Sequence, residues 1–220
     1  MSSTADRPLR ADAERNRRRI MDSARALFAE RGLDVTLNDI AHHAGVGVGT
    51  VYRRFPSKDD LIDALFEEGV SEIVAIARAG LADPDPWTGF VRTLERVLEF
   101  QEADRGLKEL MLSTRRDQAG VARVRARMVP IVSQLMARAR DAGQLRPDIV
   151  PQDFPLIQVL LGGIIDVARD EAPGLWRRYL EIILQGLRAD PHAPARLAVT
   201  APEFERMDAV MRSWRPPRRA

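Results

Sequence analysis

Helical periodicity runs through nearly the whole chain, and it constrains the fold more than any other feature of the sequence. Apolar residues recur at spacings of three and four, and no convincing run of strict alternation rich in β-branched residues indicates a strand. With 45% hydrophobic and 30% charged residues, the chain has enough apolar material to bury a core. The sequence therefore predicts an all-α fold.

Glycine, proline and N-cap residues divide the helical pattern into segments. A first helix is expected over 12–31, because Gly32 can end it with a positive φ. A second helix over 37–44 would begin at the N-cap Thr36 and end at Gly45. Further helices are expected from 48 to 54 or 55, and over 58–80, 87–103, 105–113, 117–142, 151–169 and 174–189.

Several classes of chemistry are absent from this sequence. It contains no cysteine, which excludes disulfides, thiolate metal sites and cysteine nucleophiles. The adjacent His42 and His43 cannot form the i, i+4 metal pair of a helix, so we predict neither a metal nor a cofactor. No stretch approaches the roughly 18 apolar residues of a membrane span, and the Arg-rich start is unlike a secretory signal. We expect a cytoplasmic protein without a membrane partner.

Charge is unevenly distributed along the chain. Residues 1–58 carry 11 basic and 7 acidic side chains, a net charge of +4, whereas residues 59–100 carry 3 and 10, a net charge of −7. A basic head beside an acidic neck suggests that the head meets a polyanion and the neck does not. A chance fluctuation of solvated charge would explain the distribution equally well if charge stood alone.

The head contains two short helices joined by a glycine-containing turn, which is the pattern of a helix-turn-helix DNA-binding motif. A small apolar core that includes Leu37, Ile40 and Val51 would hold the second short helix, which is too short to be stable alone. Lys58 begins the next helix, where outward backbone N–H groups suit a phosphate. The outward side of the second short helix then consists of Val48, Gly49, Thr50, Tyr52 and Arg53.

Alternative roles exist for these side chains. Tyr52 could simply cover the core of the head, but within this motif a contact to DNA is favoured. For Val48, burial in the core and contact with a thymine methyl group are equally supported. The basic run 17–19 is either a solvated helix face or a set of phosphate contacts.

Residues 20–66 closely resemble the DNA-binding region of TetR-family transcriptional regulators. The resemblance is strongest over 37–41, 44–52 and 55–61, and the length and helical content of the remaining chain also look like that family. It implies an all-helical homodimer whose two heads bind a palindromic operator on double-stranded DNA. The pair Arg53 and Arg54 stands where many members have an aromatic or histidine pair, so base preference does not carry over.

The resemblance also implies roles for particular residues and regions. Thr36 and Asn38 look like contacts from the first short helix to DNA, and Lys58 resembles the phosphate-binding lysine of the family. The expected regions are a flexible basic arm over 1–11, a helix-turn-helix domain over 12–58, a helical effector-binding and dimerisation domain over 59–190, and a tail over 191–220 with room for a partial helix.

The helices expected over 151–169 and 174–189 each carry two apolar stripes, and two stripes need two partners. One stripe would face the core of its own chain and the other a second subunit, although both could be buried within a monomer. We predict a dimer interface formed by Leu160, Gly163, Val167, Trp176, Leu180, Ile183 and Leu187.

An effector pocket is harder to place, since Met and aromatic residues at helical spacing are more often plain core. The candidates combine apolar side chains with a few polar anchors. They are Phe66, Trp87, Phe90, Phe100, Gln101, Met111, Arg115, Met128, Phe154 and Gln158.

These observations predict a ligand-responsive transcriptional regulator, most simply a repressor that is released from its operator by an unidentified small molecule. Two alternatives are a sequence-nonspecific nucleic-acid-binding protein and an all-α enzyme that uses paired carboxylates. The enzyme is disfavoured, because the sequence offers no nucleophile-base constellation, no phosphate-binding glycine loop and no metal signature.

Overall fold

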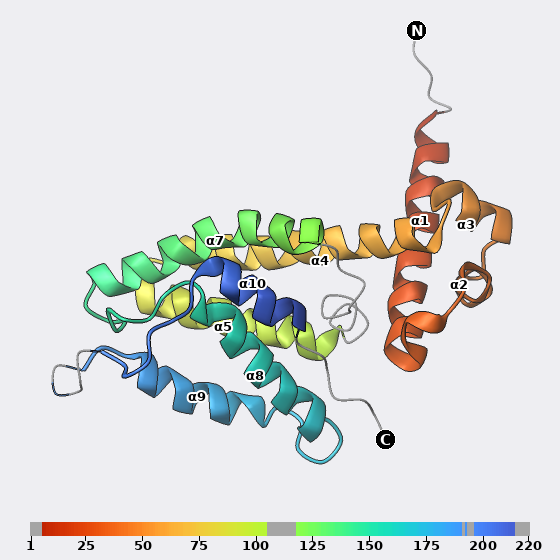
Figure 1. Ribbon diagram of the computed structural model, residues 1–220. Helices are drawn as coiled ribbons and strands as arrows, with labels where there is room; N and C mark the ends of the chain where they lie inside the picture. The colour runs from red at the N-terminus through yellow and green to blue at the C-terminus, as the bar shows by residue number, and fades with distance from the viewer. Residues whose placement is uncertain (1–5, 105–117, 191, 193–195, 214–220) are drawn as a thin grey trace, which may run out of the picture. The chain divides into compact units, whose positions relative to one another are not determined.

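The computed structural model describes residues 6–104, 118–190, 192 and 196–213 of the 220-residue chain (Figure 1). Within these ranges every regular element is a helix, and an isolated antiparallel bridge joins Leu145 and Arg188. The predicted all-α fold is confirmed. The chain forms two compact units, the first built from the described residues up to Gly69 with Asp104, and the second from Val70–Ala103 with the described residues after 117.

The first unit contains α1 (Asp6–Arg31), α2 (Leu37–Ala44), α3 (Val48–Arg54) and the start of α4 (Lys58–Leu81). Figure 1 shows α2 and α3 on the same side of α1. The helix α1 begins six residues earlier than predicted, so residues 6–11, expected as a flexible arm, continue the helix. Its core consists of fully buried side chains from all four helices, among them Ile20, Ala24, Phe28, Ile40, Ala41, Val51, Leu61 and Leu65.

Two reciprocal N-caps fix the helix-turn-helix segment. The Asp39 amide donates to the Thr36 hydroxyl (3.2 Å), while the Asp39 carboxylate accepts from the Thr36 amide (2.9 Å) and hydroxyl (2.6 Å). Ser57 and Asp60 repeat the arrangement at the start of α4. Between them Gly45 adopts φ +63°, the left-handed conformation that ends α2 and starts the turn. The predicted N-cap Thr36 and the predicted bounds of α2 and α3 match the structure.

An ion-pair cluster links α1 to α4 in the first unit. The Arg25 guanidinium lies 3.1 Å from the Glu68 carboxylate and 3.3 Å from that of Asp104. Its third partner, Asp22, is 3.7 Å away on α1 itself. A half-buried arginine with several carboxylate partners is a stronger link than an isolated surface pair.

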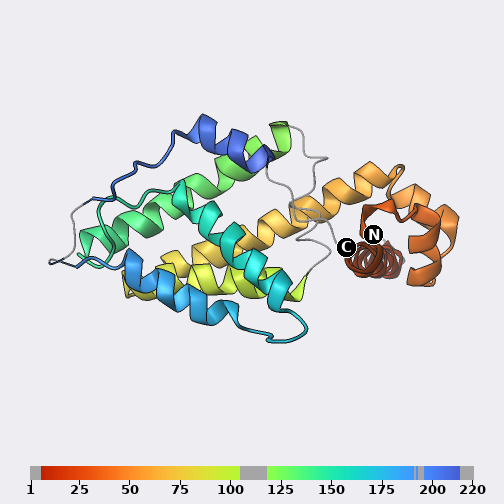
Figure 2. The same ribbon diagram turned by 60° about the horizontal axis from the view of Figure 1, so that its bottom comes forward.

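The second unit contains the rest of α4, α5 (Pro86–Ala103), α7 (Gln118–Asp141), α8 (Asp153–Ala168), α9 (Trp176–Leu187) and α10 (Phe204–Ser213). Figures 1 and 2 show α8 crossing α5. The bounds of α5, α7, α8 and α9 fall within two residues of the prediction, while the helix expected over 105–113 lies outside the described residues. The core is aromatic and aliphatic and includes Trp87, Phe90, Leu94, Leu98, Met136, Phe154, Leu161, Ile165, Trp176 and Leu180.

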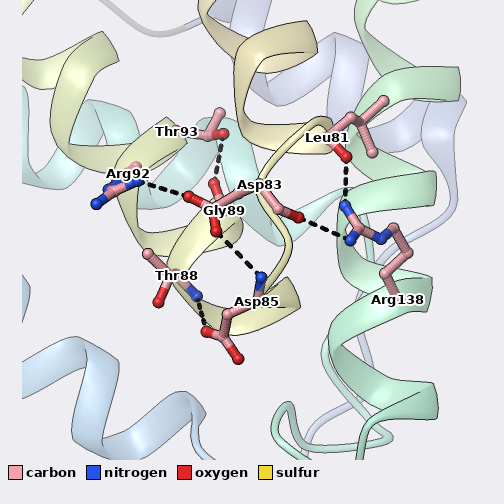
Figure 3. Close-up of polar contacts among 8 residues, drawn as sticks. All are labelled: Leu81, Asp83, Asp85, Thr88, Gly89, Arg92, Thr93 and Arg138. Atoms are coloured by element: carbon pink, nitrogen blue, oxygen red, sulfur yellow. Dashed lines mark hydrogen bonds and ion pairs between the residues drawn. The ribbon is translucent and has the colours of Figure 1, made fainter.

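The turn between α4 and α5 is held by close backbone packing. An ideal Cβ on Gly80 would lie 2.1 Å from Thr93 Oγ1, and one on Gly89 would lie 2.2 Å from the Gly80 carbonyl oxygen. The Thr93 hydroxyl donates to the Gly89 carbonyl at 2.8 Å (Figure 3). Two glycines are therefore needed here because no side chain fits between the helices.

Polar side chains cap both helices at this turn, as Figure 3 shows. The Arg138 guanidinium of α7 donates to the carbonyl groups of Leu81, the last residue of α4, and of Asp83 in the loop that follows. The Asp85 carboxylate accepts from the Thr88 amide (2.7 Å) in the first turn of α5 and from the Gln144 amide group (3.0 Å). The hydrogen bonds from Thr88 and Gln144 lower the pKa of Asp85 from 3.8 to about 2.

Asp148 ties the C-terminal segment to the second unit. Its carboxylate pairs with the Arg146 guanidinium (2.9 Å) and accepts from the Leu197 amide (2.5 Å). Hydrogen bonding to Arg146, and then to the Leu197 amide, lowers the pKa of Asp148 from 3.8 to about 2. Further along, Met207 of α10 is buried.

Replacing Gly80 with alanine tests the close packing of α4 and α5. Helix propensity alone would favour alanine by about 1 kcal/mol, but the clash with Thr93 should reverse the sign and destabilise the second unit by about 1–3 kcal/mol. The control Ala79→Gly, at an exposed position of α4, should cost about 1 kcal/mol through propensity only. Denaturant unfolding measures both, and an unfolding free energy equal to or above that of the unmodified chain for Gly80→Ala would contradict this packing.

The second unit should lose stability on acidification between about pH 4 and pH 2. Asp85 and Asp148 have folded pKa values below the ordinary 3.8, so their ionised forms stabilise the folded state above pH 4, and protonation removes that contribution as the pH falls through about 2. Thermal melting from pH 5 to pH 2 checks this. Asp148→Asn should lower the melting temperature at pH 5 and flatten the pH dependence, and an unchanged slope would refute the assignment.

Candidate nucleic-acid interface

The outward face of α3 is open to solvent, while one residue anchors the helix. Val51 is fully buried in the core of the first unit, whereas Val48 and Tyr52 are 45% and 46% exposed. Gly49 and Arg53 are also exposed. Of the two roles considered for Val48, burial in the core does not fit the structure, because nearly half of its side chain is exposed to solvent.

This face combines hydrogen-bonding side chains with a glycine, where no side chain covers the backbone. The Arg53 guanidinium donates to the Thr50 hydroxyl at 3.3 Å, which places both groups on one side of α3. A Cβ on Gly49 would meet no atom within 4 Å, so the backbone there can approach a neighbouring surface closely. Arginine and hydroxyl side chains around a bare backbone can bind phosphates and the edges of bases.

The start of α2 is the end opposite to the turn, and its polar groups are exposed. The Thr36 hydroxyl is engaged with Asp39 in the N-cap, and Asn38 lies in the first turn with its side chain exposed. The hydrogen bonds from the side chain and amide of Thr36 lower the pKa of Asp39. Thr36 is therefore first of all a structural cap, and any contact it makes to another molecule shares its hydroxyl with that role.

Lys58 has a partner inside the first unit. Its ammonium group donates to the Leu33 carbonyl in the 3-10 turn Gly32–Asp34 that follows α1. An ammonium group has three donors, so this contact leaves capacity for an external acceptor. The sequence suggested only the external role, and the contact to Leu33 adds a structural one.

In the second unit, α8 and α9 each bury one of their two apolar stripes and expose the other. On α8 the exposed stripe includes Leu160 and Val167, the latter 85% exposed, with Gly163 half-buried beside them. These three positions are on the stripe that the sequence assigned to an interface.

On α9 the assignment of the stripes needs correction. Trp176, Leu180 and Leu187 lie in the core of their own chain, with Trp176 only 1% exposed, so they have almost no surface left for a second subunit. Ile183 is half-buried against the same core. The exposed stripe is instead Leu175, Tyr179 and Ile182. Both stripes are apolar in the sequence, and long-range packing decided which one faces inward.

The predicted pocket residues are mostly packed as core. Trp87, Phe90 and Phe154 belong to the buried cluster of the second unit, and Met128 packs against it. Phe66 is buried in the first unit, Phe100 is half-buried on α5, and Met111 and Arg115 lie outside the described residues. The Gln101 amide group donates to the buried Gln158 side chain at 3.1 Å.

Some features had no counterpart in the sequence-based expectations. The N-cap Thr36 was predicted, whereas the hydrogen bonds accepted in return by the Asp39 and Asp60 carboxylates were not, although the T-x-x-D and S-x-x-D spacings indicate them. An open pocket in the second unit, lined by Glu102, Arg169 and Arg177 among others, gave no such signal. Its residues come from three separate parts of the chain.

Comparison with known proteins identifies both units. Residues 20–65 match the family model for bacterial regulatory proteins of the tetR family. Residues 85–189 match the model for the C-terminal domain of SbtR-like transcriptional regulators. An HTH-type transcriptional regulator of Staphylococcus aureus (strain USA300) is 46% identical over 54 residues, which are 24% of this chain and 29% of that protein. The chain thus aligns with less than a third of this curated relative.

Solved structures cover more of the chain. A TetR transcription regulatory protein from Mycobacterium vanbaalenii is 33% identical, with 82% of this chain and 99% of that chain covered and a TM-score of 0.60. A TetR transcriptional regulator from Streptomyces coelicolor is 28% identical, with 79% and 98% covered and a TM-score of 0.57. SmeT, described as the repressor of the Stenotrophomonas maltophilia multidrug efflux pump SmeDEF, shares the fold at 24% identity, with 84% and 97% covered and a TM-score of 0.61.

Two classes of site are absent among the described residues. In that part of the chain no helix is long and apolar enough to cross a membrane, and no group of three His, Asp or Glu residues could hold a metal. Both family models are those of transcription regulators and not of enzymes. With a helix-turn-helix unit and a helical second unit that each match the family, this chain belongs to the TetR family of DNA-binding transcriptional regulators.

Proposed function

We propose that this regulator is a repressor that binds a palindromic operator as a homodimer and leaves it when a small-molecule effector binds. The observation that carries the DNA-binding part is the open outward face of α3 around the buried anchor Val51. Repression, dimerisation and effector release are typical of the family, and SmeT is named as a repressor.

The exposed residues of α3 would contact different parts of the DNA. Tyr52 and Thr50 offer hydroxyl groups that suit phosphate oxygens, and Arg53 reaches either phosphates or guanine edges. Val48, outside the core, is free to contact a thymine methyl group. Asn38 and Thr36 at the start of α2, with Lys58 at the start of α4, would contact the DNA backbone and so fix the position of α3 along the major groove.

A homodimer is supported by the exposed stripes of α8 and α9. Burying a large apolar side chain is worth about 1.5–3 kcal/mol, so leaving these stripes in water has a substantial cost that a second copy can remove. Gly163 and Gly186 would allow close approach, since a Cβ on either meets no atom of its own chain within 4 Å. The exposed residues of the two stripes are Leu160, Val167, Leu175, Tyr179 and Ile182.

Release follows from a two-state equilibrium. An effector weakens DNA binding only by the difference between its affinities for the DNA-binding and the released conformations. Typical coupling free energies of about 1–3 kcal/mol correspond to changes of roughly 5- to 150-fold in affinity. The continuous helix α4, which runs from the first unit into the second, is our proposed carrier of this change.

Tyr52→Phe and Thr50→Ala should weaken operator binding without unfolding the protein. Loss of one hydrogen bond to a charged phosphate costs about 1.5–3 kcal/mol, or roughly 10- to 150-fold in affinity. The operator is obtained by selecting bound fragments of the host genome, and affinity is measured by fluorescence anisotropy at fixed salt. Thr200→Ala is the control for Thr50→Ala, because Thr200 is an exposed threonine of the second unit that lies outside α3, α8 and α9. Unchanged affinity for Tyr52→Phe would remove Tyr52 from the interface, and equal binding to all duplexes would favour the nonspecific alternative.

Val167→Glu should convert the dimer into a folded monomer. Val167 is 85% exposed in the single chain, so a charge there costs little within the chain but would be buried in the proposed interface. Sedimentation velocity measures the oligomeric state, and circular dichroism confirms the helices. Val199→Glu, at an 82% exposed valine away from α8 and α9, should leave the dimer intact. A dimer that persists in Val167→Glu would place the interface elsewhere.

A further inference from the structure

An open pocket of about 480 Å³ lies in the second unit where the C-terminal ends of α5 and α8 meet the start of α9. Its walls come from the last turn of α5, the end of α8, the α8–α9 loop and the first turn of α9. The residues that line it are Glu102, Ile165, Arg169, Pro173, Gly174 and Arg177.

Arg169 has an unmet hydrogen-bonding requirement. Its Nη2 is shielded from solvent and has no hydrogen-bond partner among the described residues. The nearest carboxylate oxygen, on Asp166, is 3.7 Å away and beyond hydrogen-bonding distance. An enclosed guanidinium nitrogen without an acceptor is costly, so a small rotation that brings it to an acceptor in the pocket would be favourable.

Arg177 provides a second guanidinium on the same pocket. It lies over the Trp176 ring, with Cζ 4.3 Å from the centroid, so the ring holds the group by a cation–π contact. Its ion pairs to Glu99 (3.5 Å) and Glu102 (3.6 Å) are longer than the 2.7–2.9 Å of a charge-assisted hydrogen bond. A ligand with a well-placed anionic group could therefore compete for it.

The loop between α8 and α9 gives the pocket a preformed wall. Gly174 adopts φ +81°, and a Cβ there would lie 3.1 Å from Arg177 Nη1. A glycine is thus favoured here by the backbone conformation, which L side chains rarely adopt. The loop closes through the hydrogen bond from the Arg177 amide to the Gly174 carbonyl (3.0 Å), so little ordering would be needed on binding.

From these features we infer that the pocket binds an organic monocarboxylate with an apolar body. The carboxylate would sit against Arg169 and Arg177, and the body would cover Ile165 and Pro173. Glu102 lines the same pocket and limits the negative charge that it can accept, which disfavours a dianion such as phosphate. As a location for the effector, this site rests on the proposed function, whereas binding itself does not depend on DNA.

The test is binding to the full chain without DNA, followed by thermal melting and by calorimetry. The probes are butyrate, hexanoate, octanoate, benzoate and 4-phenylbutyrate, each compared with its amide and with inorganic phosphate. At least one carboxylate should raise the melting temperature and bind at least tenfold more tightly than its amide, and phosphate should produce no shift. Failure of every carboxylate, or equal binding of acid and amide, would overturn the site.

Variants locate the binding. Arg169→Met should weaken the carboxylate at least tenfold, and Arg169→Lys should restore part of the affinity. Glu102→Gln should strengthen binding severalfold, because it removes a negative charge from the pocket. Arg178→Met is the control on the same helix, since Arg178 does not line the pocket, and it should bind as the unmodified chain does. Undiminished affinity in Arg169→Met, or weaker binding in Glu102→Gln, would refute the proposed geometry.

The same variants separate this site from the proposed function. Operator affinity of Arg169→Met without any carboxylate should equal that of the unmodified protein, because Arg169 lies in the second unit and outside the DNA-binding face. If the unmodified protein binds no operator, the proposed repressor function is wrong. If it binds its operator but no carboxylate, only the proposed pocket is wrong.

Discussion

Burial of Val51 and its neighbours in the core of the first unit is the interaction on which the DNA-binding part of this protein depends. A seven-residue helix is not stable in water by itself, so α3 exists only because that core and the two reciprocal caps hold it. Since the anchor uses one side of α3, the opposite side remains open. The open side of α3 carries hydroxyl groups, an arginine and a glycine without a side chain. These groups suit a recognition helix that lies in the DNA major groove.

The second unit uses two-sided helices in a different way. Each of α8 and α9 buries one apolar stripe in its own core and leaves the other exposed. The interior stripes hold the unit together around Trp87, Phe90 and Trp176, while the outer stripes form the surface that we propose a second copy covers across a two-fold axis. The pocket at the α8–α9 loop lies at the end of these same helices. A ligand there would therefore act on elements that the proposed dimer interface also uses.

Local signals made the first unit predictable from the sequence. Thr36, Gly45 and Pro56 set the bounds of α2 and α3, and the apolar spacing identified the buried residues of both. The second unit was harder, because the choice between the two stripes of α9 depends on packing against α5 and α8. Trp176 and Tyr179 look alike as amphipathic aromatic residues, and only the folded chain shows that Trp176 is inside. The pocket lined by Arg169 and Arg177 could not be predicted from the sequence for a related reason. Its third charged residue, Glu102, is far away in the sequence and comes close only in the folded chain.

Footprinting on a duplex selected from the host genome tests the central claim most directly, because it reports both the reading helix and the symmetry of the complex. The account predicts that the protein protects two equivalent patches related by a two-fold axis, with centres separated by about one helical turn of 10–10.5 base pairs or a multiple of it. A single unsymmetrical patch, or protection that does not depend on sequence, would contradict a homodimer that presents two copies of α3 to an operator.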